Sequence, residues 1–236
     1  MRRSIDIDFD FQEEAGGRDS DRYSPTLQEY HRILWSKPLP SGNVFVLTKI
    51  AGNRLYHKSS LGEFFLSSDR ATATFSKWKR KQIASIISQV PEVEIKRFQK
   101  LSDTIGGILI WPCKQVGRMP TINGERGFNK KIADRFDLTI ECIKRYYSGG
   151  NSPLNEAFKR YADFFSLFGN FKGYVDFFLL QDIVSVDYAT VKIATPFENF
   201  NTSPIPSNVE EYLFYKDNTI RFIKARNARI ASTHSI

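Results

Sequence analysis

The chain is poor in the residues from which most metal and disulfide sites are built. Among its 236 residues are two cysteines, two methionines and three histidines. Cys113 and Cys142 lie in different segments, so they make neither a disulfide framework nor a zinc site. His31 and His234 have no metal partner at ligand spacing. This composition favours a reducing compartment, and we expect a cytoplasmic protein.

Long apolar runs are also missing. The longest candidate, 174–184, is interrupted by Asp176, Gln181 and Asp182, and no run reaches the roughly 18 residues of a membrane span. The N-terminus has two arginines without an apolar run behind them, which is not the pattern of a secretory signal. We therefore expect no membrane partner.

Apolar and basic residues are plentiful by comparison. Hydrophobic residues make up 41% of the chain, with 20 Phe and 10 Tyr, so a sizeable core can be buried. Lys and Arg outnumber Asp and Glu by 34 to 26, a net charge of +8. Such a charge attracts polyanions such as nucleic acid, but it also suits a merely solubilising surface. Both interpretations stay open.

The order of patterned segments predicts an α+β fold, with a small mixed sheet in the N-terminal half packed by a mainly helical C-terminal half. We expect a polar, mobile or loosely docked arm over 1–25, a single domain over 26–230 and a tail over 231–236. Expected strands lie at 43–50, 63–67, 71–75, 104–111 and 186–194. Expected helices lie at 26–35, 77–90, 134–147, 151–168, 171–184 and 209–229, and 113–131 is expected to be a polar loop.

The segment 121–147 carries the most suggestive polar pattern. Asp137, Glu141 and Arg145 are four residues apart on a helix that has apolar stripes on both sides, so they share a partly buried strip. One interpretation is structural, with a Glu141–Arg145 salt bridge and capping by Asp134. The other is an active-site wall.

The loop before that helix contains Asn123 and Arg126 among Gly124 and Gly127. Glycine lets a ligand approach the backbone closely, and the planar guanidinium of Arg126 suits a phosphate or carboxylate. The string matches neither a Walker loop nor a dinucleotide fingerprint. A simple surface turn is the alternative.

A second candidate site lies at an expected strand end. Ser67 and Ser68 stand beside Asp69, with His57 upstream, so a nucleophile, a base and an acid are all nearby. The nucleophile elbow motif is absent, however, and serines at strand ends are more often turn formers.

Carboxylates alone could also hold a catalytic metal. The acidic residues that could contribute are Asp69, Asp134, Asp137, Glu141, Asp176 and Asp182. A metal-dependent nuclease using Asp134, Asp137 and Glu141 is therefore one alternative function.

Basic residues gather at 77–81, 130–131 and 221–229. Trp78 stands among the cations of the first cluster, a mixture used to hold nucleic acid, where cations take phosphates and an aromatic ring stacks on a base. A solvated helix face with Trp78 turned to the core is the alternative. A non-enzymatic module that binds nucleic acid or a protein partner, such as an antitoxin, is thus a further hypothesis.

Several long strings resemble a widespread, uncharacterised family of bacterial proteins. They are SPTLQEYHRILWSKPLPSG, TIGGILIWP, TINGERGFNKKIADRFDLTIECIKRYY, SPL, FKGYVDFFLLQD and ARNARI, between residues 24 and 230. The resemblance implies a bacterial or prophage origin and supplies no activity. The positions that match the family pattern include Asn123, Arg126, Gly127, Asp134, Arg135, Asp137, Glu141, Arg145, Asp176, Gln181 and Asp182. The stretch 54–66 is less similar, which counts against His57 and Glu63.

The polar character of these positions favours an enzyme acting on a nucleotide or nucleic acid. The most specific hypothesis is an ADP-ribosyltransferase-like toxin or phage-defence protein that uses NAD. Such an enzyme needs an Arg or His and a strand-end Ser to hold NAD, and a Glu to stabilise the developing oxocarbenium charge. Arg126 or Arg54, Ser67 or Ser68, and Glu141 could fill these roles, although such a Glu is expected on a strand or loop rather than in a helix. We assign Glu141, Asp137 and Arg126 as catalytic candidates, and Asn123, Arg135, Arg145, Ser67 and Ser68 as cofactor-binding candidates.

Overall fold

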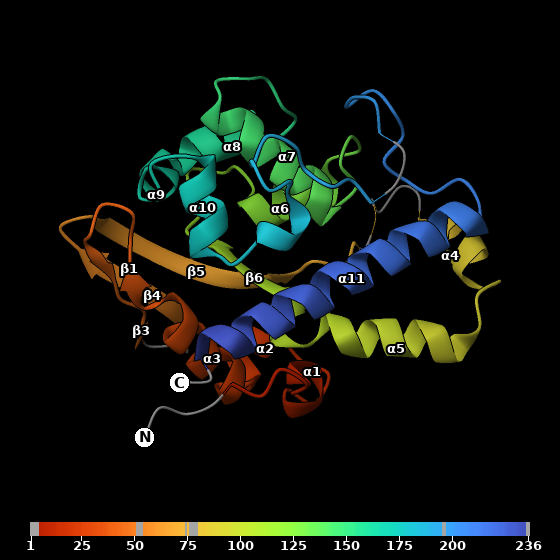
Figure 1. Ribbon diagram of the computed structural model, residues 1–236, viewed down its shortest axis with the longest axis horizontal. Helices are drawn as coiled ribbons and strands as arrows, with labels where there is room; N and C mark the ends of the chain where they lie inside the picture. Colours follow the sequence, from red (N-terminus) through yellow and green to blue (C-terminus); the bar gives the residue numbers. More distant parts are fainter. Residues whose placement is uncertain (1–4, 51–53, 74, 76–79, 195–196, 235–236) are drawn as a thin grey trace.

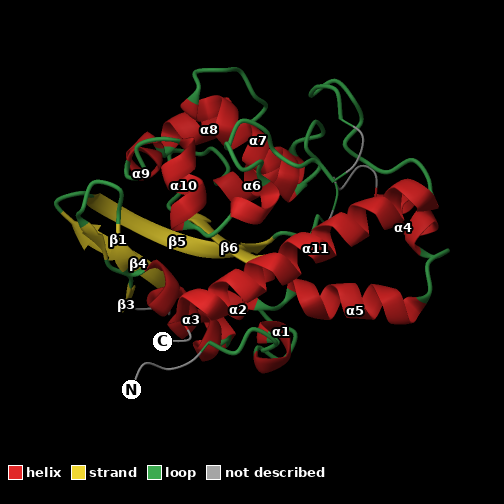
Figure 2. Cartoon of the chain, in the orientation of Figure 1, coloured by secondary structure: helices red, strands yellow, loops and turns green. Residues whose placement is uncertain are grey.

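The computed structural model describes residues 5–50, 54–73, 75, 80–194 and 197–234. Helices and a small number of strands make up the chain (Figure 2), in the order expected of an α+β fold. The predicted fold class is confirmed.

The strands are β1 (Lys37–Pro38), β2 (Val44–Phe45), β3 (Thr48–Ile50), β4 (Arg54–Ser59), β5 (Gly62–Arg70) and β6 (Ile108–Pro112). The α-helices are α1 (Phe11–Glu14), α2 (Ser20–Tyr23), α3 (Pro25–Trp35), α4 (Arg80–Ile87), α5 (Glu92–Ser102), α6 (Ile122–Phe128), α7 (Phe136–Tyr147), α8 (Asn155–Arg160), α9 (Ala162–Ser166), α10 (Phe171–Phe177) and α11 (Val209–His234). Short 3-10 turns are η2 (Ile105–Gly107) and η3 (Gln181–Ile183).

The main sheet has four strands in the order β3-β4-β5-β6, and β1 and β2 form a separate pair. All of these named strands pair antiparallel, so the sheets are not mixed as the sequence suggested. The strand β5 is a single nine-residue element, and it covers the predicted strand at 63–67. In its register Ser68 lies opposite Ile110, which brings the end of β5 beside the buried strand β6.

Helices cover the sheet on both sides (Figure 1). Helices α6–α10 lie on one face, with α9 against β5 and α6 against β6, while α11, α5 and the N-terminal helices lie on the other. The core between them is rich in aromatic side chains, such as Trp35, Phe164, Phe168 and Phe178. A separate cluster joins α4 and α5 to α11 around Tyr215.

The N-terminal segment is part of this packing rather than a loosely docked arm. Phe11 is 1% exposed and its ring contacts Tyr30 edge to face. The Glu14 carboxylate accepts hydrogen bonds from Thr26, and Asp21 accepts one from the amide of Ser68. The polar appearance of the segment hid these few anchors, because one buried aromatic ring and two carboxylates are enough to dock a short stretch.

Three expectations from the sequence differ from the structure near the candidate site. The expected loop at 113–131 contains helix α6, whose first turn is capped by the Thr121 side chain. Helix α7 begins after Arg135, so Asp134 lies one residue too early to be its N-cap. The expected strand at 186–194 is replaced by a turn with one isolated bridge between Val184 and Val191.

Candidate functional site

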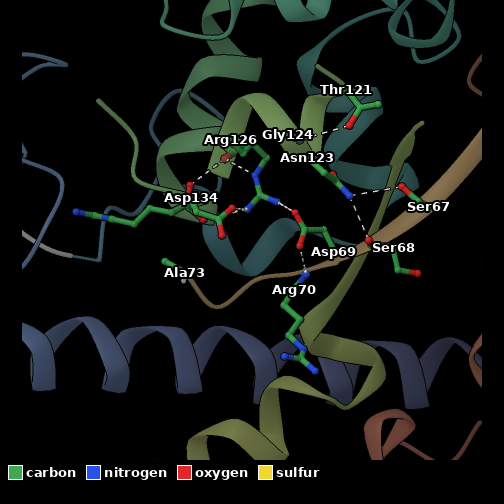
Figure 3. Close-up of polar contacts among 12 residues, drawn as sticks. Ser67, Ser68, Asp69, Arg70, Ala73, Thr121, Asn123, Gly124, Arg126 and Asp134 are labelled. Atoms are coloured by element: carbon green, nitrogen blue, oxygen red, sulfur yellow. Dashed lines mark hydrogen bonds and ion pairs between the residues drawn. The ribbon is translucent and has the colours of Figure 1, made fainter. Parts of the chain in front are cut away.

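Arg126 lies at the centre of a buried polar cluster between the end of β5 and the start of α7 (Figure 3). Its side chain is fully buried, and each guanidinium nitrogen has a partner. Nε donates to Thr139 Oγ1 at 2.9 Å, one terminal nitrogen pairs with Asp69, and the other donates to the Asp134 carbonyl at 3.2 Å. Arg126 therefore acts as an internal tie, and its guanidinium nitrogens are already bound to protein groups rather than open to a ligand.

The backbone before α7 is shaped for this tie. Ala133 and Asp134 both have positive φ, at 48° and 66°. This left-handed conformation is energetically unfavourable for residues other than glycine. The turn brings the Asp134 carboxylate to 3.6 Å from Arg126.

Burial raises the pKa of Asp69 to about 6, although the charge of Arg126 opposes that shift.

Ser67, Ser68 and Asn123 lie at the edge of the same cluster. The Asn123 amide donates to the Ser68 carbonyl at 3.2 Å and to the Ser67 hydroxyl at 3.5 Å. Ser67 lines a cavity of about 220 Å³. The charged residues of its lining are two acids, Asp19 and Asp21, and one base, Arg22. Carboxylates repel phosphate, so this cavity does not suit the pyrophosphate of NAD.

Ser68 also contacts His31, which the sequence analysis did not place near it. The indole N–H of Trp35 donates to His31 Nδ1 at 3.0 Å, so this nitrogen carries no proton. Burial and the nearby Arg226 lower the pKa of His31 to about 3, which keeps the ring neutral. His31 Nε2 must then donate to the Ser68 hydroxyl at 2.8 Å. A histidine that donates to a serine cannot take its proton, so the pair is not an activated nucleophile.

His57, the histidine proposed from the sequence, is used elsewhere. It is 1% exposed, stacks on Phe45, and its ring nitrogens contact the Val46 carbonyl and the Ser59 hydroxyl. These contacts belong to the β4 region of the core. The structure therefore gives His57 a packing role and does not join it to Ser67.

Arg135 and Asp137 form a second buried pair. Arg135 is fully buried, binds both Asp137 oxygens and donates to the Pro204 carbonyl at 3.1 Å. Asp137 also accepts the Ala194 amide at 2.8 Å. The pair thus fastens the segments around 194 and 204 to the first turn of α7.

Glu141 has the partner that the structural interpretation assigned to it. Its carboxylate pairs with Arg145 at 2.8 Å and with Lys144 at 2.9 Å. Asp137 and Glu141 share one side of α7, whereas Thr139, the partner of Arg126, projects from the opposite side because successive residues turn by about 100°. The three catalytic candidates are therefore divided between two sides of one helix.

The carboxylates proposed for a metal are divided among several arginines. Asp69 and Asp134 both contact Arg126, whereas Asp137 pairs with Arg135, Glu141 with Arg145 and Asp182 with Arg229. Across the described ranges no group of three His, Cys, Asp or Glu side chains has a metal-binding arrangement.

A pocket of about 330 Å³ opens between the start of α7, the middle of α11 and the segment 182–194. Phe136, Tyr215 and Phe222 give it aromatic walls, and the Phe136 and Phe222 rings lie 5.3 Å apart. Asp137 is the catalytic candidate from the sequence that lines it. The polar lining includes Asp182, Lys192, Asn218 and Arg221.

The charges at this pocket do not balance. The two acids are neutralised from outside the lining, Asp137 by Arg135 and Asp182 by Arg229 through two bonds of 2.8 and 2.9 Å. The two lining cations make only long hydrogen bonds to neutral groups of the described residues: Lys192 Nζ donates to the Asp182 carbonyl at 3.2 Å, and Arg221 donates to Asn218 at 3.3 Å. Within the described residues the pocket therefore presents uncompensated positive charge.

The basic segments have a mixed outcome. Residues 77–79, including Trp78, lie outside the described residues. In the segment 221–229, Arg226 is fully buried and donates to the carbonyls of Ile105, Gly106, Ile108 and Phe178, while Arg221 and Lys224 are exposed. This part of α11 is therefore not a continuous basic face.

The model of a family described as a family of unknown function, DUF6994, matches residues 5–230. The chain belongs to this family. Membership in DUF6994 extends over nearly all of the described chain and begins at residue 5, which agrees with the docking of the N-terminal segment. No curated protein and no solved structure matches the chain.

Two groups of polar residues in this DUF6994 chain come together in ways that the sequence did not predict. The His31–Ser68 contact joins residues 37 positions apart, and only the helical spacing of His31 and Trp35 hinted at it. Lys192 and Arg221 line one pocket from distant segments; Arg221 was noted as part of the basic segment 221–229, whereas no pattern marked Lys192. No helix in the described part of the chain is long and apolar enough to cross a membrane.

Proposed function

We propose that this protein binds a phosphate-bearing nucleotide in the pocket between α7 and α11. The observation that carries the proposal is the excess positive charge of Lys192 and Arg221 beside aromatic walls. A guanidinium and an ammonium take phosphate oxygens, and an aromatic wall takes a base. The cavity volume of about 330 Å³ falls at the lower end of the roughly 300–1,000 Å³ range of small-ligand sites.

The reaction that follows binding is a finer hypothesis. The hypothesis of ADP-ribosyl transfer assigns roles to Arg126, Ser67, Ser68 and Glu141. Arg126, Ser67 and Ser68 lie in or beside one buried polar cluster, where they contact Asp69, Asn123 and His31, whereas Glu141 pairs with Arg145 on another side of α7. Asp137 lies in the pocket but is held by Arg135 and by a backbone amide. We therefore centre the proposal on nucleotide binding, with transfer from NAD as the reaction to test once binding is established.

The setting of the protein is part of the proposal. Resemblance to bacterial sequences supports a bacterial or prophage origin, and the low cysteine content suits a reducing cytoplasm. Nucleic acid is a natural larger ligand for a chain of net charge +8, since its phosphates would meet the same cations.

Calorimetric titration with ATP, NAD, adenosine and inorganic phosphate tests the binding. We expect nucleotides to bind and adenosine to bind more weakly, because the cations contribute through phosphate. Equal binding of ATP and adenosine would show that these cations do not hold the ligand, and no binding of any of the four would remove the proposal.

A further inference from the structure

A second pocket, of about 550 Å³, opens beside the β1 strand and is separate from the site between α7 and α11. One wall is the segment 37–40 with its two prolines, and the other is formed by 168–170 and helix α10. Phe168 and Phe177 give it apolar surface. Two lysines line this pocket, and their surroundings differ sharply.

Lys172 is an ordinary surface lysine. Its ammonium pairs with the Asp176 carboxylate and lies 4.9 Å from the Tyr188 ring centroid. Hydrogen bonding to Asp176 raises its pKa above 10.5. Lys172 therefore stays protonated near neutral pH, which makes it an internal reference for the other lysine.

Lys37 is half-buried and its contacts are with aromatic rings. Its Nζ lies 5.1 Å from the Trp35 ring centroid and 4.7 Å from that of Phe177. Among the described residues, no carboxylate forms an ion pair with its ammonium. This cation has therefore lost part of its hydration without gaining a close opposite charge.

The groups that face Lys37 act in opposite directions. From α11, the buried Arg226 guanidinium lies 5.7 Å from the same Trp35 ring and repels a second positive charge. From α10, Asp176 attracts it but is already bound by Lys172, Gln181 and Tyr188. Burial, followed by Arg226, lowers the pKa of Lys37 to about 8, and Asp176 only partly opposes this.

We propose that Lys37 is a reactive amine and that its pocket takes a small aldehyde, which Lys37 binds covalently as an imine. A lysine becomes nucleophilic when an apolar pocket or a neighbouring cation disfavours its protonated form. Lys37 has both conditions, and the pocket in front of it has room for a ligand. This inference is independent of the nucleotide proposal, since none of its residues lines the other pocket.

The chemistry needs no other reactant. The neutral Lys37 nitrogen attacks the carbonyl carbon and forms a C–N bond. Nitrogen then gives up its two protons, and the carbonyl oxygen leaves with them as water while the C=N bond forms. Nothing is oxidised or reduced, and the reaction reverses when water returns.

Reductive trapping with pyridoxal as the probe tests this on the unmodified protein. The protein is incubated with dilute pyridoxal at several pH values between 6 and 10, treated with borohydride, digested, and the adduct on each lysine is quantified by mass spectrometry. We expect Lys37 to be modified at least about tenfold faster than Lys172 near pH 7.5, because a pKa lowered by two units or more raises the neutral fraction. The rate for Lys37 should level off above pH 8, while that for Lys172 should still rise.

Two variants sharpen the result. Lys37→Arg should remove the fast adduct and leave the labelling of Lys172 unchanged, while Lys172→Arg should leave the fast adduct in place. Equal rates for Lys37 and Lys172 in the wild type would overturn the proposal. So would a trapped fraction at Lys37 that keeps rising in parallel with that of Lys172 up to pH 10.

Discussion

Arg126 and Asp134 hold each other in both directions. The Asp134 amide donates to the Arg126 carbonyl at 3.0 Å, and the Arg126 guanidinium donates to the Asp134 carbonyl at 3.2 Å. The pair closes the turn between α6 and α7, so the side chain that the sequence offers as a ligand clamp acts as a structural tie.

Removal of this tie should therefore be costly. Arg126→Ala leaves Asp69 and Asp134 near a buried cavity without their cation, and we expect a loss of about 3–5 kcal/mol in the free energy of unfolding. Arg126→Lys keeps the charge but loses the fork, so an intermediate loss is expected. Urea unfolding measures both, with the exposed Arg118→Ala as a control expected within about 0.5 kcal/mol of wild type. A stable Arg126→Ala protein would contradict the structural role.

His31 should make the protein sensitive to acid. Its folded-state pKa of about 3 lies below its ordinary value of 6.5. Between these two pH values, His31 is protonated in the unfolded chain and neutral in the folded chain. Stability from this residue is full above pH 6.5 and is lost as the pH falls toward 3, by about 1.4 kcal/mol per pH unit. His31→Gln should flatten the slope of melting temperature against pH between 6.5 and 4. An unchanged slope would show that other groups govern acid unfolding.

Asp69 should titrate in the opposite sense. Because burial raises its folded-state pKa from 3.8 to about 6, its contribution to stability is full below pH 3.8 and is lost as the pH rises through 6. Carbon-13 NMR of the Asp69 carboxyl group measures the midpoint directly, with Asp69→Asn used to assign the signal. A midpoint below 4 would show that attraction by Arg126 outweighs burial.

The pocket cations should control nucleotide affinity. Arg221→Ala and Lys192→Ala each remove one uncompensated charge, and we expect each to weaken ATP binding by about tenfold. Lys224→Ala is a matched control, since it removes an exposed cation from the same helix outside the pocket lining. Calorimetric titration compares the three variants. If Lys224→Ala weakens binding as much as Arg221→Ala, general surface charge is responsible rather than the pocket.

Glu141→Gln separates the two interpretations of the charged strip on α7. Its partners Arg145 and Lys144 are 34% and 24% exposed, so water can solvate them once the carboxylate is gone. We expect a stability loss of about 1 kcal/mol and unchanged consumption of NAD, measured by chromatography beside a thermal melt. A folded variant that loses a measurable NAD-consuming activity would instead support the catalytic assignment.

Element type was predictable where the apolar pattern was strong. The helix expected at 209–229 is the core of α11, and the one expected at 134–147 is α7 to within two residues. The expected strand at 104–111 became η2 and β6, because Gly106 packs against α11: a Cβ there would lie 2.5 Å from Asn227 Oδ1. That closeness depends on an element more than a hundred residues away, which local patterns do not encode.

The candidate site was predicted in composition but not in geometry. The strip of Asp137, Glu141 and Arg145 on one helix follows from helical spacing, and the Glu141–Arg145 pair follows with it. Glycines at 124 and 127 suggested a loop, yet tertiary contacts and the Thr121 cap stabilise a helix there. The pairing of Arg126 with Asp69 spans 57 residues, so only the folded chain reveals that the arginine is occupied.

The backbone carbonyl groups that surround Arg226 have a consequence for folding during synthesis. Arg226 and Asn227 bind residues 104–108 and Phe178, yet α11 follows every one of these segments in the chain. During synthesis on the ribosome, the N-terminal sheet and the α6–α10 layer emerge first. Until α11 emerges, residues 104–108 and Phe178 lack the hydrogen-bond partners that Arg226 and Asn227 supply. Contacts that span about 120 residues delay folding. Released chains that end before α11 should therefore be bound by chaperones or degraded, whereas released chains that end beyond residue 230 should contain a protease-resistant domain.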